Sequence, residues 1–139
     1  MKHLFFVLLG LTCFSCFEKQ DNTYVYENVS RFYDDGKPQI ISKFKDSIEV
    51  YQKHYFPSGV LFMEGSVDKG KRTGKWTSYH ENGTTNSIGF FDQNMRTGEV
   101  KCFYNNGQLQ YSGEFHRNQK TGTWTFYDKN GAVLKTESF

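Results

Sequence analysis

A repeat of 24 residues runs through most of this 139-residue chain and constrains its fold more than any other feature. Glycines recur with this spacing in two series: Gly59, Gly83, Gly107 and Gly131, and Gly65, Gly89 and Gly113. Thr-Gly pairs and an apolar column keep the same phase, at Thr73, Thr97 and Thr121 and at Val67, Phe91, Phe115 and Phe139. So many columns in phase predict a repeat protein, in which each unit stacks on the next.

Each repeat has the pattern of a β-hairpin. An Asn-Gly pair, as at Asn106-Gly107, is the strongest two-residue hairpin signal, because both positions tolerate positive φ. The other connection is polar, and we expect it to be a longer loop, at Asp68–Thr73, Asp92–Thr97 and His116–Thr121. Between the turns, residues 109–115 alternate apolar and polar side chains, which indicates a strand with one buried face.

The composition agrees with an all-β chain rich in rings. Aromatic residues make up 18% of the sequence, whereas Ala132 is the only alanine. One aromatic column consists of Trp76, Val100 and Trp124, and another of Tyr55, Tyr79, Phe103 and Tyr127. We expect rings of these columns to cover the mid-strand glycines. Trp124 and Tyr127 are three residues apart, so either both faces carry aromatics or a bulge intervenes.

These residues resemble the MORN-repeat variant family, whose bacterial members include proteins labelled YwqK-type antitoxins. The clearest copy runs from Tyr111 through Gly113, Phe115 and Trp124 to Gly131. The resemblance covers residues 32–139 and implies consecutive hairpins laid side by side as one elongated, twisted, single-layer antiparallel sheet. It also implies an interaction module, and it brings no catalytic residues.

The N-terminal segment has the features of an export signal followed by a lipid attachment site. Lys2 precedes an apolar stretch at 4–14, which is shorter than the roughly 20 residues that span a bilayer. The pair Ser15-Cys16 is similar to the end of a bacterial lipoprotein signal, whose cysteine is diacylated. Cys16 is thus the predicted lipidation site, with Cys13 as the alternative cysteine and an ordinary secretory signal as the alternative signal.

The chain therefore divides into three predicted parts. They are a signal peptide at 1–15, a lipidated N-terminus with a tether and a first irregular strand at 16–31, and the repeat domain at 32–139. Phe17 stands where an aspartate commonly signals inner-membrane retention, which favours the outer membrane as the address within the cell envelope.

Catalytic and nucleic-acid functions find little support in the sequence. His54, His80 and His116 fall in three different columns and lack the spacing of a metal site. Once Lys2 is removed with the signal, the remaining chain has 16 basic and 15 acidic residues. This balance gives no indication of the concentrated basic surface that nucleic acid requires. Cys102 is interpreted as a small buried hydrophobe. We expect no enzyme activity, no cofactor and no metal.

Two sets of residues are candidates for binding. The aromatic set is Trp76, Trp124, Tyr79 and Tyr127, and the basic set is Arg72, Arg96 and Lys120. Core packing and solvated turn charge are the alternative roles. Because a single-layer sheet covers few of its rings, we expect some to bind a protein partner, in an antitoxin-like or immunity-like capture. The alternative ligand is a glycan or a lipid headgroup held by the cations.

Overall fold

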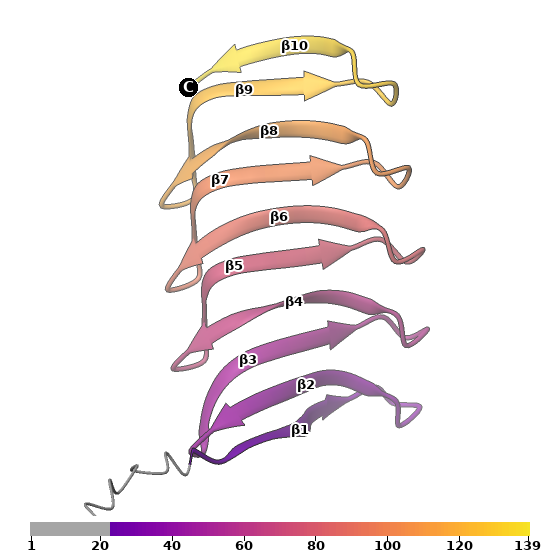
Figure 1. Cartoon of the computed structure of the whole chain (residues 1–139), viewed down its shortest axis with the longest axis vertical. Helices are drawn as coiled ribbons and strands as arrows, with labels where there is room; N and C mark the ends of the chain where they lie inside the picture. The colour runs from indigo at the N-terminus through magenta and orange to yellow at the C-terminus, as the bar shows by residue number, and fades with distance from the viewer. Residues whose placement is uncertain (1–22) are drawn as a thin grey trace, which may run out of the picture.

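Residues 23–139 of the computed structural model form one open antiparallel sheet, and its strands follow one another in chain order (Figure 1). The strands are β1 (Val25–Phe32), β2 (Pro38–Lys45), β3 (Ile48–Tyr55), β4 (Leu61–Asp68), β5 (Lys71–Tyr79), β6 (Thr85–Asp92), β7 (Met95–Phe103), β8 (Leu109–His116), β9 (Gln119–Tyr127) and β10 (Val133–Ser138). Each pairs with its neighbours in sequence, which leaves β1 and β10 as the two edges. The predicted all-β, single-layer sheet of consecutive hairpins is confirmed.

The predicted export signal at 1–15 and the predicted lipidation of Cys16 lie outside the described residues. The sheet begins at Val25, inside the segment predicted to hold the tether and a first irregular strand. In the described part of the chain there is no helix that is long and apolar enough to cross a membrane.

The two kinds of turn are the reverse of the sequence prediction. The connection expected to be long is a two-residue turn, in which Gln93 and Asn94 have φ values of 49° and 71° and join β6 directly to β7. Positive φ at both central residues is the signature of a type I′ turn. The equivalent pairs also have positive φ: Asp46 and Ser47, Lys69 and Gly70, and Arg117 and Asn118. The polar residues predicted to fill a loop therefore belong largely to the strands.

The Asn-Gly connections are three-residue loops instead. The N–H of Gly83 donates to the carbonyl of His80 at 2.8 Å, and Gly83 has a φ of 84°, whereas Asn82 keeps a negative φ. This is a type I turn followed by a left-handed glycine. The side chain of Asn82 has another role, because its Nδ2 donates to the carbonyl of Asn105 in the next repeat at 3.1 Å. An equivalent bond forms one repeat later, so these asparagines tie successive repeats together.

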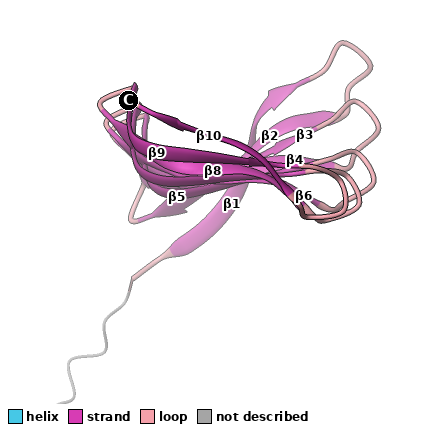
Figure 2. Ribbon diagram, turned by 90° about the horizontal axis from the view of Figure 1, so that it is seen from above, coloured by secondary structure: helices cyan, strands magenta, loops and turns pink. Residues whose placement is uncertain are grey.

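The aromatic columns lie on opposite faces of the sheet, which resolves the two alternatives left by the sequence. Along β5, Trp76, Thr77 and Ser78 pair in unbroken register with β4 and β6, so Trp76 and Tyr79 point to opposite sides. Irregularities flank this stretch: the pairing with β4 skips Gly74 and Lys75, and the pairing with β6 shifts between Ser78 and Tyr79, where the extra residue is on β6 and leaves the alternation along β5 intact. With the twist of the sheet, the strands at the β1 end run in a different direction from those at the β10 end (Figure 2).

The core is thin and lies on one face. Trp76 and Trp124 are only 4% and 2% exposed, and Val67 is 5% exposed. The indole of Trp76 covers Gly65 and that of Trp124 covers Gly113, so a Cβ atom on either glycine would lie well inside van der Waals contact with the ring. The predicted coverage of mid-strand glycines is confirmed at these two positions.

Candidate binding surface

We define the tryptophan face as the face of the sheet that carries the columns Trp76/Val100/Trp124 and Arg72/Arg96/Lys120. Cross-strand pairing places them together: Trp76 lies opposite Gly89, Phe91 opposite Arg96, and Phe115 opposite Lys120. Tyr79 and Tyr127 of the predicted binding set lie on the opposite face. Their separation follows from the period of two along a strand.

Arg72, Arg96 and Lys120 are each stacked on an aromatic ring that lies 19 residues further along the chain. The guanidinium of Arg72 lies 4.2 Å from the ring centroid of Phe91, and that of Arg96 lies 5.2 Å from Phe115. The ammonium of Lys120 lies 4.6 Å from the ring of Phe139. Such cation–π contacts fix long side chains in place and contribute about 0.5–1 kcal/mol each at exposed sites. The cations thus form an ordered row along the sheet.

Within residues 23–139, none of these three cations forms an ion pair, although Glu137, opposite Trp124, is near enough to Lys120 for that charge to add to the hydrogen bond from Lys135 in lowering the pKa of Glu137. Across residues 23–139, the ion pairs involve Lys37, Lys53, Lys101 and Lys135. Arg72, Arg96 and Lys120 therefore keep their charge available for a ligand. Burial lowers the pKa of the Arg72 guanidinium, and the positive charge of Arg96 adds to this effect.

The two tryptophans of the predicted binding set form the core. Their burial favours the packing interpretation, because a partner would have to displace Arg72 or Lys120 to reach either indole. The Trp76 Nε1 donates to the carbonyl of Ser66 at 2.9 Å, which orients the ring. On this face, the side chains that remain accessible to a partner are mainly the cations and the half-buried rings beside them.

On the opposite face, Tyr79 takes part in a small polar group. Its hydroxyl donates to Glu64 Oε1 at 2.7 Å, and burial together with this carboxylate raises the pKa of Tyr79 to about 12. The same causes raise the pKa of Tyr51 to about 12. Both tyrosines therefore stay neutral at ordinary pH, and Glu64 on β4 interacts with Tyr51 on β3 and Tyr79 on β5. Tyr127 lies in the equivalent column of β9, where its carbonyl accepts from the Tyr104 hydroxyl at 2.9 Å.

A polar cluster near the β1 edge was missed by sequence reasoning. Ser42 is fully buried and donates to the carboxylate of Glu49, which also accepts from Gln52 Nε2 at 2.9 Å. His54 bonds through Nε2 to Gln52 Oε1 at 3.0 Å, and burial lowers its pKa, with the charges of Arg72 and Arg31 acting in the same direction. The histidine bonds to an amide and not to the serine, so the cluster lacks a nucleophile–base pair. It lies before Tyr55, where the 24-residue columns of glycines and aromatics begin, so the repeat pattern gives no signal for it.

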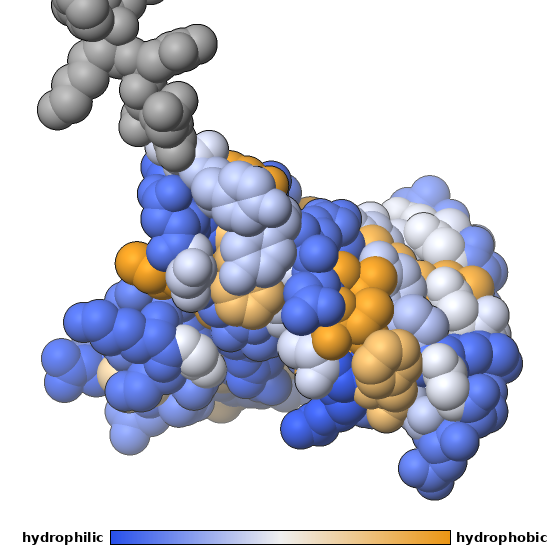
Figure 3. Space-filling model, turned by 90° about the horizontal axis from the view of Figure 1, so that it is seen from below, coloured by the Kyte–Doolittle hydropathy of each residue, from blue (hydrophilic) through white to orange (hydrophobic). Residues whose placement is uncertain are grey.

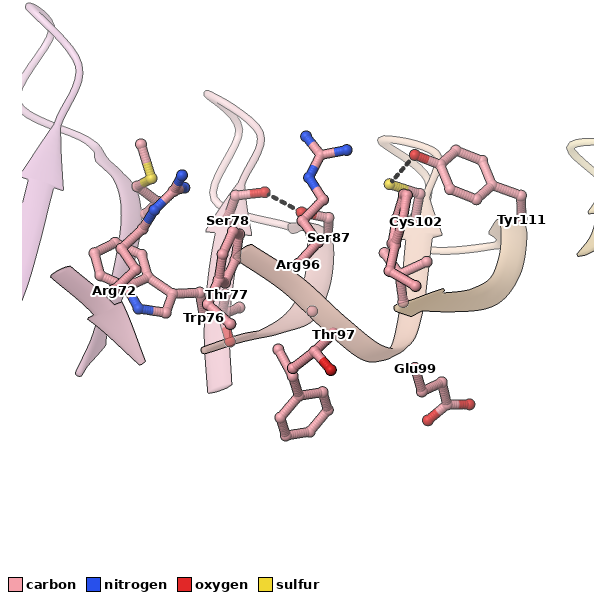
Figure 4. A pocket seen from close by; sticks show the side chains of 16 residues that line it. Arg72, Trp76, Thr77, Ser78, Ser87, Arg96, Thr97, Glu99, Cys102 and Tyr111 are labelled. Atoms are coloured by element: carbon pink, nitrogen blue, oxygen red, sulfur yellow. Dashed lines mark hydrogen bonds between the residues drawn. The ribbon is translucent and has the colours of Figure 1, made fainter. Parts of the chain in front are cut away.

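An open hollow of about 190 Å³ lies on the tryptophan face at the middle repeat (Figure 4). Val100 lines the hollow, at the position in the repeat where the neighbouring repeats have Trp76 and Trp124. Figure 4 shows Arg72, Arg96, Cys102 and Tyr111 on one side of the strands and Thr97 and Glu99 on the other. The thiol of Cys102 donates to the Tyr111 hydroxyl at 2.9 Å, and burial raises the pKa of that thiol.

Comparison with protein families now identifies the repeat. The model described as the MORN repeat variant matches residues 72–93, 96–117 and 120–139. The chain contains three consecutive MORN-repeat variants. Each matched MORN segment begins at a cation of the tryptophan face, so the family repeat has the same phase as the row of cations. No curated protein matches the chain.

Among the described residues, no group of three or more His, Cys, Asp or Glu side chains is arranged to hold a metal ion. At the β1 end of the sheet, apolar residues form small groups separated by hydrophilic ones rather than one large patch (Figure 3). The tryptophan face of the MORN repeats carries both the hollow and the row of ring-stacked cations.

Proposed function

We propose that this protein is a noncatalytic binding module of the cell envelope, anchored through a lipid on Cys16, and that it captures a protein partner on the tryptophan face. The observation that carries this proposal is the row of ring-stacked cations at Arg72, Arg96 and Lys120, none of which forms an ion pair within residues 23–139. Ordered charges of one sign attract and orient an acidic partner.

The repeat architecture supports this proposal. MORN repeats suggest a repeat-based binding module. Neighbouring strands are about 4.8 Å apart, so equivalent cations recur roughly every 10 Å along the sheet. A protein surface or an extended peptide spans such a row, and an antitoxin-like or immunity-like capture is the form that we favour. The predicted export signal and Phe17 after Cys16 support an outer-membrane address.

An anionic glycan or lipid headgroup is the second candidate ligand. The same unpaired cations favour it, since guanidinium groups bind phosphate and carboxylate through bidentate hydrogen bonds. This ligand would depend on charge alone, whereas a protein partner also contacts the rings beside the cations.

The proposal is tested with two charge-matched triple variants. In the first, Arg72, Arg96 and Lys120 are changed together to Gln. In the second, three lysines of the opposite face are changed to Gln: Lys53, Lys75 and Lys101. Both variants lose the same charge. Capture of proteins from detergent-solubilised envelope is compared with binding to vesicles containing phosphatidylglycerol.

We expect the first variant to lose the captured protein and the second to keep it. Equal loss in both variants would show that capture depends on net charge and would refute the assignment to the tryptophan face. Binding of the wild type to anionic vesicles with no captured protein, abolished by added salt, would favour the headgroup ligand instead.

A further inference from the structure

The hollow at Val100 occupies the position where a repeated indole ring is missing. In the adjacent repeats, Trp76 and Trp124 press against Gly65 and Gly113. A Cβ atom on the equivalent glycine, Gly89, would lie 3.7 Å from the nearest methyl group of Val100, which is an ordinary contact. The backbone thus keeps the glycine that makes room for a ring, while the chain supplies no ring of its own.

The cation beside the hollow also lacks one of its two rings. Arg72 lies between Phe91 and Trp76, whose centroids are 4.2 and 5.7 Å away. Lys120 lies between Phe139 and Trp124, at 4.6 and 4.5 Å. Arg96 is stacked on Phe115 alone, at 5.2 Å. An aromatic ring placed in the hollow would give this exposed guanidinium its second stacking partner.

The rings around the hollow at Val100 are equivalent to the rings that pack against Trp124. Trp124 meets Phe115 edge to face at 5.1 Å and Phe139 at 6.2 Å. By the 24-residue repeat, a ring above Val100 would meet Phe91 and Phe115, and both line the hollow. An apolar cavity of about 150 Å³ is large enough to bind benzene, so about 190 Å³ accommodates one aromatic side chain.

The charges at the rim select the kind of aromatic ligand. Arg72 and Arg96 flank the hollow, and within residues 23–139 neither forms an ion pair. Glu99 points away on the other side of the strands (Figure 4). The row continues to Lys120, so the positive surface extends beyond the hollow. Cations about 10 Å apart correspond to three residues of an extended peptide at roughly 3.3 Å per residue.

We propose that the hollow receives an aromatic side chain of a protein partner, presented by an extended acidic segment whose carboxylates bind Arg72 and Arg96. This inference rests on the proposed function and specifies its partner. The ring completes the interrupted tryptophan column, and the carboxylates neutralise the guanidinium groups on either side. Arg–carboxylate bonds give direction and register as well as affinity.

Three peptides test this proposal on the purified protein. They are Gly-Asp-Gly-Trp-Asp-Gly, its version with Asn for both Asp, and its version with Ala for Trp, each with blocked ends. Binding is measured by calorimetry, and the Val100 methyl signals are followed by NMR for a ring-current shift. We expect the first peptide to bind at least tenfold more tightly than either control and to shift the methyl signals.

Variants of the protein locate the binding. Val100→Trp should fill the hollow, raise the melting temperature by several degrees and abolish peptide binding; Val100→Leu is a smaller filler if the indole disturbs folding. Arg96→Gln should weaken the acidic peptide about tenfold, whereas Lys101→Gln, on the opposite face, should leave it unchanged. Retained binding by folded Val100→Trp, or equal binding of acidic and neutral peptides, would overturn the proposal.

Two further comparisons separate this inference from the proposed function and from a small-molecule site. If Val100→Trp keeps the captured envelope protein that the Arg72/Arg96/Lys120 variant loses, the aromatic assignment fails while the proposed function stands. If neither variant loses it, both fail. Tighter binding of indole-3-propionate than of the acidic peptide would overturn the assignment to a protein partner.

Discussion

The mid-strand glycines allow the packing of the tryptophan face to be tested by one substitution at equivalent positions. At Gly113, an added methyl group would collide with the ring of Trp124, which is 2% exposed and fixed by Phe115 and Phe139. Overpacking of this kind costs about 1–3 kcal/mol. At Gly89 the same methyl group meets Val100 at an ordinary 3.7 Å. Alanine there should be neutral or should stabilise the fold by roughly 0.4–1 kcal/mol, because it restricts the unfolded chain.

The assay is urea unfolding followed by tryptophan fluorescence, with thermal unfolding as a second measure. We expect Gly113→Ala and Gly65→Ala to lower the melting temperature by several degrees, at roughly 4 °C per kcal/mol, and Gly89→Ala to leave it unchanged or raise it. Equal destabilisation at all three positions would show that backbone conformation, and not ring coverage, requires glycine. A neutral Gly113→Ala would refute the packing itself.

Four further outcomes follow from the same structure. Burial, together with the Cys102 thiol, raises the pKa of Tyr111 from 10 to about 12. The unfolded chain therefore loses this proton at lower pH than the folded chain does, and the free energy of unfolding should fall between about pH 10 and 12. Tyr111→Phe should reduce that fall, as measured by denaturation midpoints across this pH range. Asn118→Val, at a φ of 70°, should cost about 1–2 kcal/mol, and Asn130→Val, at negative φ, should cost less in the same unfolding assay. Phe139→Ala should cost about 1 kcal/mol in thermal unfolding rather than a full ring burial, because the ring packs on Trp124 yet stays 57% exposed. The intact mass of the mature protein should include a diacylated Cys16 at its N-terminus, and a mass without acyl chains would disprove the anchor.

The order of hairpins could be predicted from the sequence because it follows from strict periodicity. A fixed spacing of glycines and aromatics allows one arrangement of strands per repeat, and that arrangement recurs along the sheet. The cover over Gly65 and Gly113 was predictable for the same reason, since a glycine within a strand often marks a place where another group approaches closely.

The prediction exchanged the two kinds of turn because the backbone conformation at these positions differs from the one that the residue types prefer. Gln93 and Arg117 adopt a left-handed conformation that their residue types rarely favour, and the sheet twist selects it. The asparagines at 82 and 106 hold inter-repeat bonds that no local pattern encodes. These features depend on contacts about 23 residues apart in the chain.

The candidate site was only partly predictable. The basic column Arg72, Arg96 and Lys120 was visible as a repeat, but its stacking on Phe91, Phe115 and Phe139 required the strand register. Val100 was visible as an exception in the tryptophan column. Whether the neighbours would close the gap depends on packing in three dimensions, and in this structure they leave it open.

The central claim, that a partner binds the tryptophan face, is tested most directly by photo-crosslinking from the chain's own methionines. Met63 lines the hollow on the tryptophan face, whereas Met95 lies on the opposite face, paired with Asp92. Photo-methionine is incorporated into two variants, Met95→Leu and Met63→Leu, and each is irradiated in the cells that produce it. We expect the variant that retains Met63 to form a crosslinked protein adduct and the variant that retains Met95 to form none. An adduct from Met95 alone, or equally from both, would contradict the account.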